Sequence, residues 1–359
     1  MFKRNFAALL LLFVAAGVRA RCVAHTFVQP PPAFAAAAAN ARAVICAQLA
    51  EHVPAAQIAV GVDGRVVWSA ALGNVGQTTR MRIGSISKPI TADVFALLVQ
   101  EGKLDPDAPI ARYVPNLPEQ LRPITSRQLA GHLGGIRHYV GDKEFYSNKH
   151  FASVTDGLIV FENDPLVAPP GTKYAYSTYG YSLLSAALEG AAHRDFPALL
   201  RTLVFEPLHM TQTKLDDGSA PGFEADANSD RFHRSPPVDN SYKWAGGGVL
   251  STAEDLVKFG SAHLRTGRLN YASLGLLFTS MKTADGKATD YGAGWDVHTD
   301  TRGRRLVSHF GSAVGGTARM MVDRDSGVVV VLLTDITNSD RVGEALGAGW
   351  PEILKLFDR

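Results

Sequence analysis

The stretch Arg82-Ile83-Gly84-Ser85-Ile86-Ser87-Lys88-Pro89 decides how this chain of 359 residues is interpreted. It ends a β-rich segment and opens a helix, because apolar residues follow it at helical spacing until Gly102 offers a stop. These apolar residues are Ile90, Val94, Leu97 and Leu98. Ser85 and Lys88 are three residues apart, so on a helix their side chains share one face and can meet.

A serine three residues before a lysine indicates nucleophilic catalysis when both lie at the start of a helix. The Ser85 hydroxyl is a weak nucleophile until a base removes its proton, and a desolvated Lys88 amine can be that base. The helix N-terminus disfavours the ammonium form and presents free N–H groups to a developing oxyanion. Alone, the pattern equally fits a helix cap beside a surface charge, so it needs partners elsewhere.

A tyrosine cluster at residues 170–181 supplies one such partner. A tyrosine hydroxyl held near a cation can act as a phenolate or as a proton relay. We favour Tyr176 for this role, with Ser177 and Thr178 as hydrogen-bonding neighbours. The alternative is that these aromatic side chains only pack the core.

A second partner is Ser308-His309-Phe310-Gly311-Ser312, at the end of a predicted strand. Gly311 has no side chain, so a substrate could approach the strand backbone closely there. The N–H of Ser312 could then pair with that of Ser85 as an oxyanion hole. A purely structural histidine is the alternative for His309.

Composition and charge describe a globular protein. The chain is 46% hydrophobic and 19% charged, and its net charge of +2 gives no electrostatic case for nucleic acid. No internal apolar run reaches the length of a membrane span. Cys22 and Cys46 are too few for a disulfide framework, although one bridge between them could form in an oxidising compartment. His132, His138 and His150 lack metal-ligand spacing, so we interpret them as loop or hydrogen-bonding residues. The nucleophilic catalysis indicated above implies no metal and no organic cofactor.

The N-terminus predicts export. Lys3 and Arg4 precede an apolar run at residues 6–14, and Val18-Arg19-Ala20 is a plausible cleavage site for a signal peptide of residues 1–20. We therefore expect a periplasmic or secreted protein, or a membrane tether if the signal stays uncleaved. The oligomeric state is left open.

Strand patterns lie at both ends of the sequence, and helical patterns lie mostly between them. The patterns predict a hairpin at residues 58–70, four strands at 291–298, 304–309, 317–322 and 328–334, and terminal helices at 33–52 and 340–357. This indicates a mixed α/β (α+β) fold in which one antiparallel sheet, built from both chain ends and flanked by helices, carries a mostly helical insertion. We expect a linker at 21–32, the sheet domain at 33–109 and 241–359, and the insertion at 110–240.

Together, these motifs resemble the serine β-lactamase and penicillin-binding-protein family in its class C-type branch. The chain is most similar there to the group of the mitochondrial serine β-lactamase-like protein and its bacterial relatives, over about residues 57–338. Further stretches that carry the resemblance are 101–105, 124–129, 134–139, 164–166, 241–248 and 291–295.

The resemblance implies a two-part fold with the site in between, and it assigns roles by position. Ser85 is implied as the acylated nucleophile, Lys88 as its base and Tyr176 as the second proton-transfer residue. The substrate-binding positions implied are Thr178, His309, Phe310 and Gly311.

Two motifs depart from the family pattern. Thr178 stands where class C enzymes usually have asparagine, and His309-Phe310 replaces Lys-Thr. A lysine at that site helps to bind a substrate carboxylate, and a neutral imidazole does so less well. We therefore expect a small molecule or peptide with an amide or ester bond as the substrate, and β-lactams less so. The alternative is a ligand sensor or self-assembling structural protein without catalysis.

Overall fold

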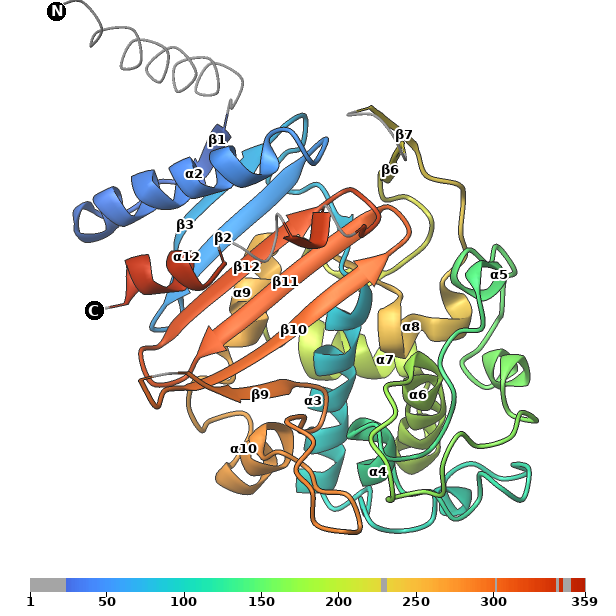
Figure 1. The fold of residues 1–359 in the computed structure, drawn as a ribbon. Coiled ribbons are helices and arrows are strands. Elements are labelled where there is room, and N and C mark those ends of the chain that lie inside the picture. Colours follow the sequence, from blue (N-terminus) through green and yellow to red (C-terminus); the bar gives the residue numbers. More distant parts are fainter. Residues whose placement is uncertain (1–23, 227–230, 301, 340–341, 345–349, 359) are drawn as a thin grey trace, which may run out of the picture.

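The computed structural model describes residues 24–226, 231–300, 302–339, 342–344 and 350–358. Within them, seven strands form one antiparallel sheet in the order β1-β3-β2-β12-β11-β10-β9 (Figure 1). The strands are β1 (Ala24–Val28), β2 (Ala56–Val62), β3 (Arg65–Leu72), β9 (Asp296–Thr299), β10 (Arg305–Ala313), β11 (Gly316–Asp323) and β12 (Val328–Thr334). The predicted sheet from both chain ends is therefore confirmed.

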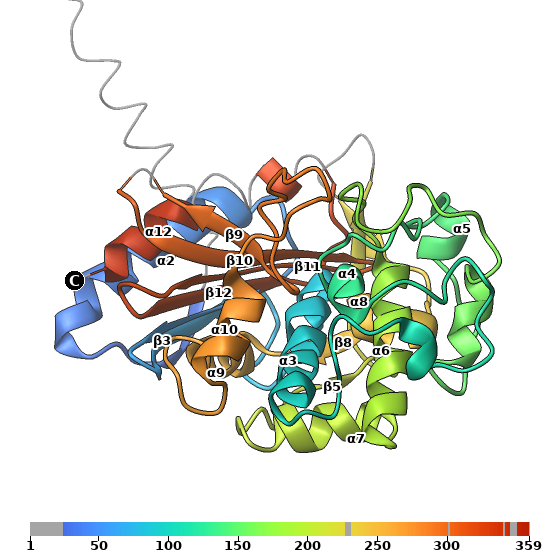
Figure 2. The ribbon, with the colours of Figure 1, turned by 90° about the horizontal axis from the view of Figure 1, so that it is seen from below.

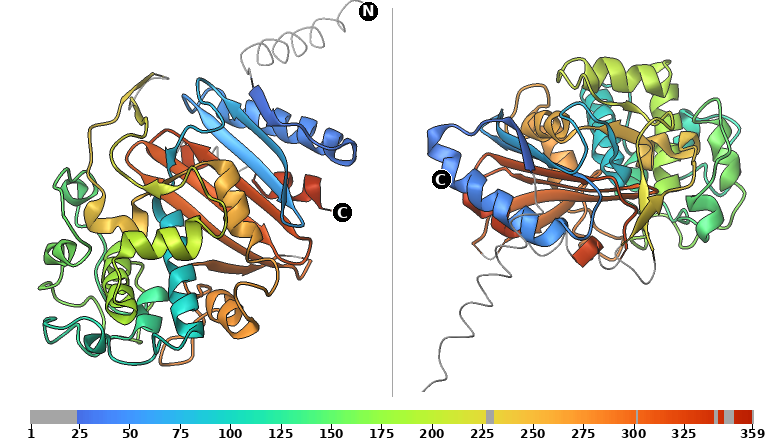
Figure 3. Two further views of the ribbon diagram at one scale, coloured as in Figure 1. Left: turned by 180° about the vertical axis from the view of Figure 1, so that it is seen from behind. Right: turned by 90° about the horizontal axis from the view of Figure 1, so that it is seen from above.

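Helices cover both faces of this sheet (Figures 2 and 3). Helices α2 (Ala35–Leu49) and α12 (Trp350–Phe357) lie on one face, and α3 (Ser87–Gln100) and α9 (Ala253–Ser261) lie on the other. The remaining helices are α4 (Ser126–Ala130), α5 (Asp142–Phe145), α6 (Thr178–Ala192), α7 (Phe196–Leu200), α8 (Trp244–Gly247) and α10 (Tyr271–Phe278). Short strands are β4 (Met81–Arg82), β5 (Lys214–Leu215), β6 (Phe223–Ala225), β7 (Phe232–Arg234) and β8 (Val249–Ser251). The domain boundaries at 109/110 and 240/241 stay a prediction.

Strand β12 contributes side chains to two hydrophobic cores, one on each face of the sheet. All its residues are buried, and successive side chains point to opposite faces of the sheet. One set packs with α2 and α12, and the other packs with the helices behind the sheet. The first set is Val328, Val330 and Leu332, and the second is Val329, Val331 and Leu333. A continuous apolar run is what a strand covered on both faces requires.

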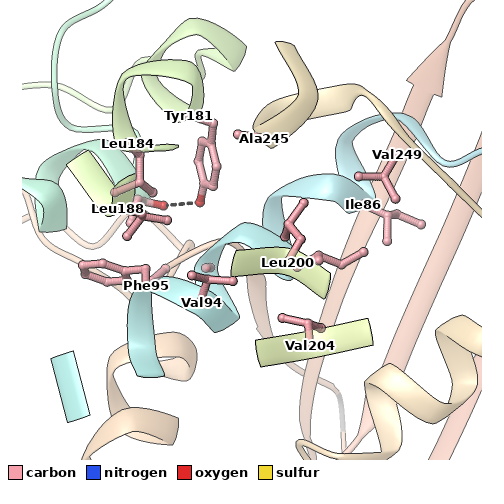
Figure 4. Close-up of a cluster of buried hydrophobic side chains, with 14 of the residues drawn as sticks. Ile86, Val94, Phe95, Tyr181, Leu184, Leu188, Leu200, Val204, Ala245 and Val249 are labelled. Carbon is pink, nitrogen blue, oxygen red and sulfur yellow. Dashed lines mark hydrogen bonds between the residues drawn. The ribbon is translucent and has the colours of Figure 1, made fainter. Parts of the chain in front are cut away.

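The larger core fixes the start of α3, which directly follows the 3-10 turn Gly84–Ile86 that carries Ser85. Figure 4 shows side chains from α3, α6, α7 and α8 meeting in one cluster. The labelled members include Val94, Phe95, Leu184, Leu188, Leu200 and Ala245. Tyr181 of α6 also donates a 2.7 Å hydrogen bond to the carbonyl oxygen of Ala130. Helix α3 is thus held on several sides and presents its first turn at a defined position.

Three glycines let the chain before α3 lie directly on β10 and β11. A Cβ on Gly311 would lie 2.0 Å from the carbonyl oxygen of Ile83, and one on Gly316 would lie 2.5 Å from that of Arg82. Gly84 adopts a positive φ of 50°, and its Cβ would lie 2.6 Å from the Ser312 nitrogen. Only backbone without side chains can approach this closely, so these glycines bring the Ser85 backbone against that of Ser312.

Several predictions made for the chain ends need correction or lie outside the described residues. Residues 24–28, expected to belong to a linker, form the edge strand β1, which pairs with β3. The strand expected from residue 291 begins at Asp296. The signal peptide and Cys22 lie outside the described residues, so cleavage and the pairing of Cys22 with Cys46 stay predictions. No described helix has the length and apolar character to cross a membrane.

Alanine at Gly311 should destabilise the protein by about 1–3 kcal/mol, because its Cβ would overlap the Ile83 carbonyl. Gly275→Ala in α10 is the control, since nothing lies within 4 Å of that Cβ. There, alanine should be neutral or stabilising by up to about 1 kcal/mol. Urea unfolding measures both free energies. Equal stability of Gly311→Ala and the wild type would contradict the close packing of β10 on the Ser85 segment.

Candidate active site

Ser85 and Lys88 meet at the start of α3, as their spacing predicted. Lys88 Nζ lies 2.9 Å from Ser85 Oγ, 3.2 Å from Thr178 Oγ1 and 2.7 Å from the carbonyl oxygen of Gly246. The Lys88 side chain is fully buried, whereas Ser85 is partly exposed. The serine therefore faces the solvent side, and the lysine approaches it from the protein interior.

The surroundings of Lys88 disfavour its charged form. Burial lowers the pKa of Lys88 well below its ordinary value, and the nearby Lys243 lowers it further. An uncharged amine has two N–H donors and one lone pair. In the charged form, Nζ donates to Ser85, Thr178 and the Gly246 carbonyl. In the uncharged form, two donors match Gly246 and Thr178, and the lone pair can accept the Ser85 proton.

Tyr176 lies beside the same pair. Lys88 Nζ lies 4.7 Å from the centre of the Tyr176 ring, and the Ser85 side chain interacts with the phenol. Burial raises the pKa of Tyr176 well above its usual value, and the contact with Ser85 only partly opposes this shift. The phenol is consequently protonated at neutral pH. Of the two roles considered for Tyr176, its environment favours a proton relay over a phenolate.

Two histidines hold the tyrosine segment in place. The N–H of Ser177 donates to Nδ1 of His132 at 3.1 Å, and the N–H of Thr178 lies 3.3 Å from Nδ1 of His138. The His132 ring also packs on Tyr176, with centroids 4.3 Å apart. Both histidines were expected to be loop or hydrogen-bonding residues, and these contacts agree with that expectation.

His309 is buried and uncharged. Its Nδ1 lies 2.6 Å from the Phe310 carbonyl oxygen, which can only accept, so Nδ1 carries the proton. Nε2 then accepts the hydrogen bond from the Tyr291 hydroxyl, 2.9 Å away. Burial, followed by the nearby Lys88, lowers the pKa of His309 to about 3. A neutral imidazole with both nitrogens engaged is a weak partner for a substrate carboxylate.

A pocket of about 320 Å³ joins these elements. Its walls include the predicted residues Ser85, Tyr176, Thr178, His309, Phe310 and Ser312. Gly311 is not among these wall residues, and the space on the side where a Cβ would lie is filled by the Ile83 carbonyl, so its role in substrate binding stays a prediction. Lys88 lies behind the wall, in contact with Ser85.

Six further residues line the pocket that the sequence motifs did not indicate as site residues. The additional lining residues are His138, Tyr139, Phe145, Lys243, Gly247 and Asp296. Apart from Asp296, the first residue of β9, they come from loops and short helices whose sequence has no apolar period, and only the family resemblance at residues 241–248 pointed to Lys243. The segment that carries Tyr139 and Phe145 is braced by Arg137, which forms ion pairs of 2.8 Å with Glu144 and 2.6 Å with Asp164.

Comparisons with known proteins assign most of the chain to one family. A family model described as Beta-lactamase matches residues 41–349. The human mitochondrial serine beta-lactamase-like protein LACTB is 29% identical over an alignment of 375 positions. The alignment covers 75% of this chain and 68% of that protein.

Solved structures share the fold. The D-amino acid amidase of Ochrobactrum anthropi has a TM-score of 0.74 at 23% identity, covering 89% of this chain and 96% of the amidase. The octameric penicillin-binding protein homologue of Pyrococcus abyssi has a TM-score of 0.75 at 22% identity, covering 88% of this chain and 77% of the homologue.

Replacing Tyr291 by phenylalanine should lower the free energy of unfolding by about 1–3 kcal/mol, because Nε2 of buried His309 would lose its donor. Tyr271→Phe is the matched control, since Tyr271 is 86% exposed, and should change stability by less than about 0.5 kcal/mol. Chemical unfolding compares the two variants. If both match the wild type, the hydrogen bond assigned to the His309 tautomer is wrong.

Proposed function

The chain belongs to the beta-lactamase family of serine hydrolases, and from that premise we propose that it cleaves amide or ester bonds through an acyl-enzyme on Ser85. The observation that supports this most is the 2.9 Å contact between Ser85 Oγ and the buried amine of Lys88. A nucleophile and its base within hydrogen-bond reach, inside a pocket, are what acyl transfer requires.

The proposed reaction begins when Lys88 takes the Ser85 proton and Oγ attacks the substrate carbonyl carbon. The resulting oxyanion is stabilised by the N–H groups of Ser85 and Ser312, whose backbones the glycine contacts bring together. The bond to the leaving group then breaks. The Tyr176 phenol passes a proton to that group and recovers one from the Lys88 ammonium. Water attacks the Ser85 ester by the same route and releases a carboxylic acid.

The finer assignments belong to this proposal as well. Thr178 orients Lys88 through its 3.2 Å contact, while His309 and Phe310 line the pocket for substrate. The neutral imidazole at His309 favours peptides, amides and simple esters over β-lactams. Export to the periplasm or exterior follows from residues 1–20 and is proposed on their sequence alone.

Ser85→Ala should abolish hydrolysis of a p-nitrophenyl ester, lowering kcat by about a thousand-fold or more, because no other group supplies the nucleophile. The control is Ser219→Ala, which removes an exposed hydroxyl from a surface turn and should leave the rate unchanged. Intact mass after a fluorophosphonate probe should show one label, lost only in Ser85→Ala. A folded wild-type protein that neither labels nor turns over the ester would favour a sensor or scaffold.

Lys88→Arg should be as inactive as Lys88→Met, with ester turnover reduced by about 100-fold to 10,000-fold. Arginine keeps a positive charge beside Ser85 but cannot give up its proton, so it cannot act as the base. The rate of labelling by the fluorophosphonate probe should fall in parallel in both variants. Substantial activity in Lys88→Arg alone would show that Lys88 acts through its charge and not as a base.

A further inference from the structure

Lys243 is a buried amine in the wall of the active-site pocket that the proposed reaction does not use. It lies in the segment before α8 and is 3% exposed, and its side chain lines the same pocket as Ser85. Its nitrogen has one close polar contact, the Phe145 carbonyl oxygen at 3.3 Å. An ammonium group has three donors, so most of its hydrogen-bonding capacity is unused.

Aromatic faces surround the rest of the Lys243 ammonium. Nζ lies 4.9 Å from the ring centre of Tyr139 and 5.0 Å from those of Phe145 and Tyr242. These faces attract a cation but do not replace a hydrogen-bonding anion. No carboxylate among the described residues forms an ion pair with Lys243. The carboxylate whose charge raises the pKa of Lys243, that of Asp216, is already engaged by Arg82 at 2.7 Å and by the Asn240 amide at 2.6 Å.

Burying a cation without an anion is unfavourable, and the pKa of Lys243 reflects this. Burial lowers the pKa of Lys243 to about 7, because the desolvation outweighs the distant attraction of Asp216. A ligand that brings one negative charge would supply the missing partner and favour the charged form. A carboxylate matches this site better than a phosphate, which usually requires several converging donors.

We propose that Lys243 binds a carboxylate of the substrate, so that the preferred acyl donor is an amide or ester that also carries a free acid group. This rests on the proposed hydrolysis at Ser85. The carboxylate is bound at the part of the wall formed by Lys243, Tyr139 and Phe145, while His309, which lines the same pocket from β10, is neutral. Lys243 is then a specificity-determining residue, and its contact with the acid group orients the scissile carbonyl over Ser85.

The test compares two series of p-nitrophenyl esters, one with a free carboxylate and one in which that carboxylate is capped as an uncharged methyl ester. One series consists of p-nitrophenyl hydrogen succinate, glutarate and adipate, which place the acid at increasing distance from the ester. The second series carries the same acids capped as methyl esters. For each pair, the ratio of kcat/KM for the acid to that for its capped form reports the carboxylate contact. Any effect of a substitution on Lys88 cancels in this ratio.

We expect the wild type to prefer the acid in at least one pair, and Lys243→Met to lower that ratio about ten-fold or more. Lys243→Gln serves as a second neutral variant if the methionine variant does not fold. Lys103→Met is the matched control, because Lys103 is an exposed lysine just beyond the far end of α3 and pairs with Glu101. It removes the same net charge and should keep the wild-type ratio.

The outcomes separate the two proposals. If the capped esters are turned over and Ser85→Ala abolishes that turnover, the result supports the proposed hydrolysis and does not bear on Lys243. If the wild type turns over the capped esters but shows no preference for any acid, the role of Lys243 is refuted while the hydrolase stands. The role is equally refuted if Lys243→Met and Lys243→Gln both keep the wild-type ratio, or if Lys103→Met lowers it as much as they do. Absence of all turnover would overturn both proposals.

Discussion

The site depends on burying the Lys88 amine against the Ser85 hydroxyl. A fully buried amine is tolerated only if its N–H groups have acceptors, and Gly246 and Thr178 provide these for Lys88. Those acceptors come from α8 and α6, two helices far apart in the sequence. The packing of α3, α6 and α8 in one core is thus the condition under which Lys88 can be a base.

The sheet supplies the second half of this condition. Its strand β10 lies so close to the segment before α3 that only glycine fits at Gly84 and Gly311. This contact brings the backbones of Ser85 and Ser312 together, although 226 residues separate them in the chain as numbered. The helical core therefore fixes the position and surroundings of Lys88. The glycine contact with the sheet fixes the place where two backbone N–H groups can bind an oxyanion.

Sequence patterns predicted the sheet, the start of α3 and the main site residues, because each has a local signal. Alternating or continuous β-branched runs mark β2 and β12, and helical spacing marks α3. Features that depend on tertiary register had no such signal. Strand β1 was missed because it pairs with β3 beside a proline-rich stretch, and the contact of Gly311 with the chain's own Ile83 had no sequence signal. Lys243 was missed as a site residue because its loop has no periodicity.

The electrostatics of the pocket explain why its basic groups cannot be equivalent. Lys88, Lys243 and His309 are all buried around one small volume, so desolvation opposes charge on each. Both amines lie over aromatic rings, but burial lowers the pKa of Lys243 only to about 7, whereas burial together with the nearby Lys243 lowers that of Lys88 well below its ordinary value. Positive charge in the pocket is therefore expected to reside on Lys243. This division lets one lysine act as a base while the other attracts an anion, which two lysines with equal surroundings could not do.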